Sequence, residues 1–213
     1  MRDTVITSAA VLVAALAAAP ALAHPHVFVT GKSEVIFTDG KVSAVRHLWT
    51  FDDLYSSYAV QGLAKNGKLA TRDDFAPLAK ENAGSLAENG YFTVVKINGK
   101  QVDFGDVTDY WMEEGPDHLV SFHVTLPLKV PSTTGKAMTL QVFDPEYFIN
   151  FEFDEKTPPK MVGAPDGCSI GLNRPDPLKV EDTKKLSESV ITGLSPGQGY
   201  GLKLASRAIV ACP

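Results

Sequence analysis

The chain has 213 residues, 44% of them hydrophobic, and a formal net charge of −5. Its length is sufficient for one domain with a hydrophobic core. The acidic balance argues against nucleic acid or an anionic membrane surface as a partner.

The first 23 residues carry the pattern of an export signal. A positive start is followed by an apolar run at residues 4–19, which is too short to span a bilayer comfortably. Pro20 ends the run, and Ala21-Leu22-Ala23 fits the small-x-small rule for signal peptidase. We therefore predict a signal peptide over 1–23 and an exported, soluble chain over 24–213. An uncleaved membrane anchor is the alternative.

Strand signals open the mature chain. Residues 26–51 are rich in β-branched and aromatic residues, and Asp39-Gly40 in their middle predicts a β-hairpin. Asp52 and Asp53 open a predicted helix over 53–65, with one of the two as its N-cap. A second helix is predicted from Asp73 to about Glu88.

Further strands are expected after the helices. They are predicted over residues 91–104, where Asn98-Gly99 is a second hairpin signal, and over 118–128, 137–144 and 146–153. Residues 157–177 are rich in Pro, Gly and Asp and predict irregular structure, and 180–194 are weakly helical. We therefore predict an α+β fold, an antiparallel β-sheet with two helices inserted after the first hairpin, in one domain over 24–213.

The two cysteines, Cys168 and Cys212, both lie late in the chain. In an oxidising compartment an even pair predicts one disulfide, which closes a 44-residue separation and contributes about 3–4 kcal/mol by loop-closure arithmetic. Its expected role is to tether the C-terminal segment. A dithiol metal site is the alternative, and the chain lacks C-x-x-C spacing for it.

Cleavage after Ala23 makes His24 the first residue of the mature chain. His24 then carries a free α-amine and an imidazole, which can chelate one ion together. His26 points to the same side in an extended segment, so three nitrogens become available, a set that suits Cu, Ni or Zn better than Ca or Mg. Pro25 has no N–H and blocks the binding mode that uses deprotonated backbone amides. The alternative is that His24 frays and His26 merely begins a strand.

Carboxylates elsewhere could complete this metal site. If Thr38 faces Lys41, the hairpin register places His26 opposite Asp53. The same register places His47 opposite Lys32, roughly 20 Å from His26 along the strand, which removes it as a co-ligand. Asp144 is a second acidic candidate, with turn formation as its alternative role.

Other histidines and one calcium-like segment are weaker candidates. His118 lies in a polar turn, and His123 could reach the site only if its strand neighbours the first strand. Residues 66–75 resemble half of an EF-hand loop, but Gly62 and Ala64 supply no side-chain oxygens at its first ligand positions. We expect a helix–helix connection there.

Several segments together resemble one bacterial periplasmic family of uncharacterised function. They are "HPHVFV", "LWTFDDLYS", "GYFTVVKINGK", "TLPL" and "VFDPEYFINF". The family is domain of unknown function number 1007, also described as a periplasmic component of an ABC-type transport system. Its members are often encoded with nickel/cobalt-type permeases. The resemblance covers most of residues 24–212, including both cysteines, and implies a periplasmic location and a role in transition-metal handling.

Three functions remain open from the sequence. The first is a non-enzymatic metal-binding accessory protein that buffers Zn, Ni, Co or Cu, or delivers it to a membrane transporter, with His24, His26, Asp53 and Asp144 as ligands. The second is a copper-dependent oxidative enzyme, against which the chain shows no obvious aromatic plane for a substrate and no common hydrolase motif. The third is a metal-free module that docks a permease through residues 50–63.

Overall fold

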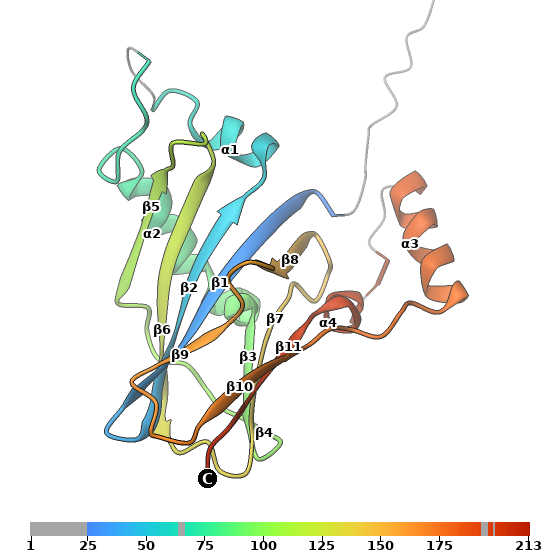
Figure 1. Cartoon of the computed structure of the whole chain (residues 1–213). Coiled ribbons are helices and arrows are strands. Elements are labelled where there is room, and N and C mark those ends of the chain that lie inside the picture. The colour runs from blue at the N-terminus through green and yellow to red at the C-terminus, as the bar shows by residue number, and fades with distance from the viewer. Residues whose placement is uncertain (1–24, 64–66, 193–195, 198) are drawn as a thin grey trace, which may run out of the picture.

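The computed structural model describes residues 25–63, 67–192, 196–197 and 199–213 and folds them around two β-sheets (Figure 1). Sheet A has the strand order β5-β6-β2-β1-β8, and β9 also pairs with β1. Its strands are β1 (Val27–Thr38), β2 (Lys41–Phe51), β5 (Asp109–Glu114), β6 (Val120–Ser132), β8 (Ile149–Phe153) and β9 (Lys160–Val162).

Sheet B has the strand order β10-β11-β7-β3-β4. Its strands are β3 (Thr93–Ile97), β4 (Lys100–Gln101), β7 (Met138–Val142), β10 (Ser169–Asn173) and β11 (Arg207–Ala211). The predicted α+β class is confirmed. The strands divide between two sheets rather than forming one, and β8 and β9 run parallel to β1.

Both predicted hairpin turns are confirmed. Asp39 and Gly40 join β1 to β2 with φ angles of 51° and 73°, and Asn98 and Gly99 join β3 to β4 with φ angles of 51° and 79°. Asn, Asp and Gly accept these left-handed conformations, and the resulting turns match the twist of the strands. The β3–β4 hairpin is short because β4 has only two residues.

The helices are α1 (Asp53–Ala59), α2 (Ala76–Ser85), the 3₁₀ helix η1 (Ala87–Phe92), α3 (Val180–Thr192) and α4 (Tyr200–Leu204). The helices α1 and α2 are shorter than predicted. Asp52 caps α1 by accepting a hydrogen bond from the Tyr55 N–H at 2.8 Å. The chain turns at Gly62, whose φ is 80°, and α2 starts later than predicted because a Thr71–Asp74 turn precedes it. No helix within the described segments combines the length and apolar character needed to cross a membrane.

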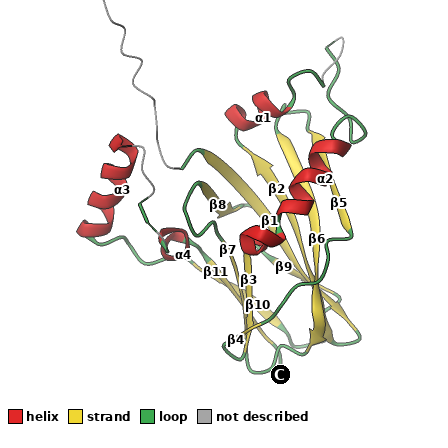
Figure 2. Cartoon of the chain, turned by 180° about the vertical axis from the view of Figure 1, so that it is seen from behind, coloured by secondary structure: helices red, strands yellow, loops and turns green. Residues whose placement is uncertain are grey.

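The core lies between the inner faces of the sheets, with α2 covering the β5 side of sheet A (Figure 2). Val35, Val45 and Leu126 of sheet A and Val95 and Leu140 of sheet B are all fully buried in one cluster. This burial removes apolar surface from water and is the main force that holds the sheets together. Helix α3 lies apart from both sheets (Figure 1).

Four strands were missed from the sequence. β5 follows a Gly- and Asp-containing stretch, and β9 and β10 fall within residues 157–177, where irregular structure was predicted. β11 is the segment for which only a tether was expected. Cys168 and Cys212 extend the β10–β11 register, in which Ser169 faces Ala211, and their Sγ atoms are 2.07 Å apart as a disulfide.

Candidate metal site at the histidine segment

His26 lies at the start of β1 and is fixed by the loop before β8. The His26 N–H donates a 2.8 Å hydrogen bond to the Phe148 carbonyl, and its imidazole stacks on the Phe148 ring with centroids 4.5 Å apart. His24, the other predicted histidine ligand, lies outside the described residues. The described part of the segment therefore presents one imidazole in a defined place at the end of sheet A.

Asp144 organises the loop that holds His26. Its buried carboxylate accepts hydrogen bonds from the N–H groups of Glu146 at 2.9 Å, Phe148 at 2.9 Å and Ile149 at 3.0 Å. The Asp144 carbonyl also packs so closely on Gly201 that a Cβ there would collide with it. The turn-forming role that was the alternative for Asp144 is present, and three backbone donors occupy both of its side-chain oxygens.

The structure assigns different roles to Asp52 and Asp53, either of which the sequence allowed as the helix N-cap. Asp52 is the N-cap of α1, and its second side-chain oxygen accepts a 2.6 Å hydrogen bond from the Phe28 N–H. Asp53 is exposed in the first turn of α1 at the same end of the sheet. The Asp53 carboxylate is not the one that caps α1, so Asp53 remains the predicted co-ligand.

A β-bulge shifts the predicted hairpin register by one residue. Thr38 faces Lys41 as expected, but the register changes between Ile36 and Phe37. Beyond that point Ser33 faces His47, where the sequence predicted Lys32. The predicted pairing of His26 with Asp53 was therefore wrong in register, although both residues lie at the same end of the sheet.

His47 is a core residue that joins the two sheets. Its Nδ1 lies 2.7 Å from the Ser33 hydroxyl of β1 and its Nε2 lies 3.2 Å from the Thr93 hydroxyl of β3. Only 1% of its surface is exposed, and this burial lowers the pKa of the imidazole from 6.5 to about 3. Its two nitrogens are engaged, which agrees with its exclusion as a metal ligand.

His123 lies on the outer face of sheet A, away from His26. β6 neighbours β2 rather than β1, so the condition under which His123 could reach the histidine segment is not met. Its Nε2 lies 2.9 Å from Glu113, and its ring stacks on Trp111 with centroids 4.3 Å apart. Burial lowers its pKa, and Glu113 opposes that shift.

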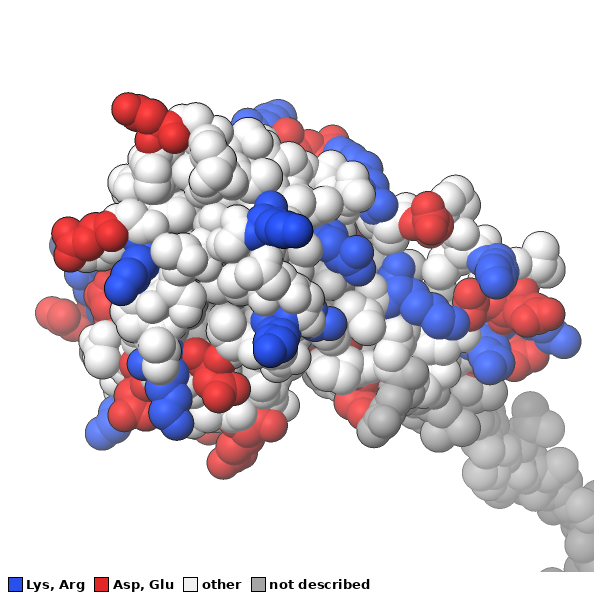
Figure 3. All heavy atoms as spheres, turned by 90° about the horizontal axis from the view of Figure 1, so that it is seen from below, with Lys and Arg blue, Asp and Glu red and all other residues white. Residues whose placement is uncertain are grey.

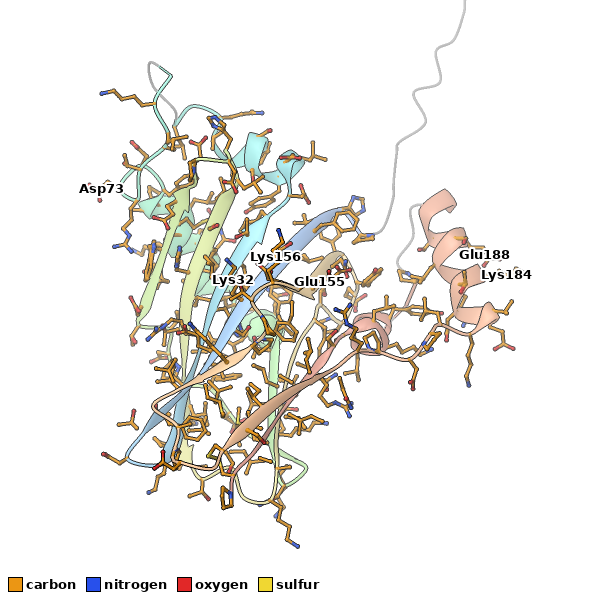
Figure 4. All side chains as sticks on the ribbon, in the orientation of Figure 1. Lys32, Asp73, Glu155, Lys156, Lys184 and Glu188 are labelled. Carbon is orange, nitrogen blue, oxygen red and sulfur yellow. A yellow bond between two sulfur atoms is a disulfide. The ribbon has the colours of Figure 1, made fainter. Side chains whose placement is uncertain are left out.

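The aromatic and cationic surface around His123 was not predicted from the sequence. Trp111, His123, Leu48 and Lys32 face one another in a row across β5, β6, β2 and β1. They line a hollow of about 300 Å³, and the Arg72 guanidinium lies 4.0 Å from the centre of the Trp111 ring. The Lys32 Nζ lies 3.6 Å from Asp154, in the segment that follows β8; Figure 4 labels Lys32 and two further residues of that segment, Glu155 and Lys156. Recognising this row required the register of β5, a strand that was not predicted.

The last histidine candidate forms a local contact. The His118 Nδ1 lies 2.9 Å from Glu114, whose other oxygen accepts a 2.7 Å hydrogen bond from the Ala70 N–H. Glu114 thus anchors the connection between α1 and α2, part of which falls outside the described residues. That connection joins two helices, as expected for the segment that resembles half of an EF-hand.

A family model described as a protein of unknown function (DUF1007) matches residues 9–212. The chain belongs to the DUF1007 family. No curated protein matches the sequence. Metal handling and transport, which the resemblance implied, are not part of the description of this family.

In this DUF1007 chain, three segments on which the resemblance was based meet at one end of the fold. His26 and Phe28 come from "HPHVFV", Asp52 from "LWTFDDLYS" and Phe148 from "VFDPEYFINF". Asp52 bonds to Phe28, and Phe148 bonds to His26. We call this group of contacts the histidine end. Within the described ranges, no three His, Cys, Asp or Glu side chains are grouped to hold a metal.

Proposed function

We propose that the mature chain is an exported, non-enzymatic protein that binds a divalent transition metal and delivers it to a membrane transporter. The metal site comprises the α-amine and imidazole of His24 and the imidazole of His26, with Asp53 as the carboxylate that can complete it. Amine and imidazole nitrogens suit Zn, Ni, Co and Cu. The leader sequence before His24 supports a periplasmic location.

The observation that carries this proposal is the way in which His26 is held. Backbone bonding and ring stacking on Phe148 fix its place, and Asp144 holds the loop around Phe148 through three hydrogen bonds, one of them from the Phe148 N–H. A ligand that is already ordered loses little conformational entropy when a metal binds. Asp144 therefore supports the site from behind the loop rather than coordinating the ion.

Exposed apolar side chains at the histidine end support transfer to a protein partner. Leu54 and Tyr58 lie one turn apart on α1 with 76% and 73% of their surfaces exposed. Phe28 and Phe148, at the same end of the fold, are 51% and 46% exposed. Exposed apolar groups gathered at one place are typical of a protein contact. The same surface is also compatible with a metal-free docking module, which makes metal binding the decisive measurement.

The test measures binding of Zn, Ni, Co and Cu by calorimetry to mature protein whose first residue is His24. A form with one added N-terminal glycine removes the His24 α-amine from the chelate while keeping every side chain. We expect the glycine extension and His26→Ala each to lower the affinity for the preferred metal roughly tenfold or more, because each removes one ligand.

His118→Gln is the matched control because it removes an exposed imidazole that pairs with Glu114 and is not one of the proposed ligands. Its affinity should equal that of the parent. Unchanged affinity in the glycine-extended form and in His26→Ala contradicts the proposed site. Native mass spectrometry of the exported protein gives the cleavage site and the bound metal in one measurement, and oxygen consumption by copper-loaded protein favours the enzymatic alternative.

A further inference from the structure

The outer face of sheet B carries a second hollow, of about 560 Å³, across β3, β7 and β11. Three cations and three polar side chains line it, namely Lys96, Lys136, Arg207, Asn98, Thr139 and Gln141. No acidic side chain is among the described residues that form its wall. This concentration of positive charge stands out in a chain whose net charge is −5.

Strand register sets the arrangement of the hollow. Met138 and Leu140 point into the core, so Thr139 and Gln141 of β7 point outward. Lys96 of β3 faces Thr139 on one side, and Arg207 of β11 faces Gln141 on the other. The two cations therefore flank the polar pair from opposite strands, and their long side chains can close on a ligand between them.

The cations of this hollow have no acidic partners in the described chain. Lys96, Lys136 and Arg207 form no ion pair there, whereas the cations on the outer face of sheet A do. On that face, Glu34 bonds to Arg46 at 2.9 Å and to Lys160 at 3.0 Å. The positive charge on sheet A is thus neutralised within the protein, and that on sheet B is left for a ligand.

Gln141 adds a buried polar group to this surface. Its side chain lines the hollow, although only 5% of its surface is exposed. An amide N–H₂ at the floor of a cationic hollow is a directional donor for an oxygen atom.

We propose that this hollow binds a phosphate-type oxyanion. Lys96, Lys136 and Arg207 supply the charge, and the Gln141 amide donates to one oxygen. Lys and Arg are the usual partners of phosphate groups, and bonds to a charged acceptor are stronger than neutral ones. The phosphate can belong to a small soluble molecule or to a lipid headgroup.

The hollow is separate from the histidine end. It lies near the β3–β4 turn at the lower end of Figure 1, whereas β1 begins at the opposite end. Figure 3 views the molecule from this lower end and shows Lys and Arg side chains across the middle of the surface. Oxyanion binding and metal binding can therefore be gained or lost independently.

The experiment titrates mature protein with inorganic phosphate and pyrophosphate in calorimetry, and with phosphatidylglycerol vesicles in a sedimentation assay. We expect Lys96→Gln to weaken binding about tenfold and Gln141→Leu about fivefold, because the first removes a charged donor and the second an uncharged donor to the anion. Lys80→Gln, on the exposed surface of α2, is the matched control and should leave binding unchanged.

Binding of the soluble anions alone identifies a free phosphate compound, and binding of the vesicles alone identifies a headgroup. Each result supports the site, provided that Lys96→Gln and Gln141→Leu weaken the binding and that circular dichroism shows both variants to be folded. The proposal is overturned if neither probe binds. It is equally overturned if folded Lys96→Gln and Arg207→Gln bind with the affinity of the parent.

Discussion

The His47 imidazole is the clearest case in which a single residue couples the fold to pH. Its pKa of about 3 in the folded state lies below the ordinary 6.5 because the ring is buried between the sheets. As the pH falls below 6.5, the unfolded chain takes up a proton that the folded chain does not. The contribution of His47 to stability is therefore complete above pH 6.5 and declines toward pH 3.

We expect this residue to remove about 2–3 kcal/mol from the free energy of unfolding between pH 7 and pH 4.5. His47→Gln keeps an amide for Ser33 or Thr93 but cannot titrate, so its stability should fall less over the same range. Urea unfolding at both pH values measures the difference. His118→Gln, which changes an exposed ring, should behave as the parent does; equal pH dependence in His47→Gln and the parent contradicts this account.

Side-chain roles at single positions were only partly predictable. The sequence identified Asp52 and Asp53 as cap and candidate ligand without assigning them, because both residues suit an N-cap. The assignment depends on the hydrogen bonds of Asp52 to Tyr55 and Phe28, and the second of these comes from a distant strand. The role of Asp144 could be named as turn formation because a short carboxylate bonds readily to nearby backbone N–H groups.

At the scale of elements, turns were predicted better than strand edges. Asp39-Gly40 and Asn98-Gly99 identified both hairpins because few residues adopt the backbone angles that such turns need. The bulge beside Ile36 had no comparable signal in the sequence. Because of it, the residue that faces His47 is Ser33 and not the predicted Lys32. β9 and β10 were missed because their pairing partners, β1 and β11, are distant in the chain.

The disulfide closes the end of the β10–β11 pair. Replacing both cysteines, as Cys168→Ala with Cys212→Ala, should lower the free energy of unfolding by about 3–4 kcal/mol through the greater freedom of the unfolded chain. Urea unfolding with and without reductant measures this loss. Reductant should destabilise the parent and leave the double variant unchanged, so equal responses of the two proteins contradict the prediction.

At the scale of the whole molecule, Trp49 connects elements that are far apart in the sequence. Its ring centroid lies 5.0 Å from that of His47, 5.1 Å from Phe151, 6.2 Å from Phe122 and 6.5 Å from Phe92. Trp49 is 3% exposed, whereas the second tryptophan, Trp111, is half-buried on the outer face of sheet A.

The two tryptophans should therefore differ sharply when they are truncated. We expect Trp49→Ala to lower the free energy of unfolding by about 3–5 kcal/mol because it leaves a large cavity in the core. A loss of this size is enough to unfold many domains of this size. Trp111→Ala should cost about 1 kcal/mol because its neighbours are open to water. Thermal unfolding followed by circular dichroism compares them, and similar losses in the two variants contradict the proposed core.

The sequence predicted the class of the fold and one part of its candidate site. The His-Pro-His start could be recognised because its chemistry is local, involving an amine and two imidazoles within three residues. The stacking of His26 on Phe148 and the hollow of sheet B could not be recognised, since each depends on strands that only the fold brings together. Knowledge of the β3–β7–β11 register was needed to place Lys96, Gln141 and Arg207 on one face.

The position of β11 has a consequence for the order of assembly. This strand comes last along the chain, yet it lies between β10 and β7 in the interior of sheet B. A polypeptide emerging from a ribosome or a membrane pore with its amino end first can pair β1, β2, β5 and β6 early. β3, β4 and β7 can also pair before β11 is available, but β10 pairs with β11 and can join sheet B only once residues 207–211 have emerged.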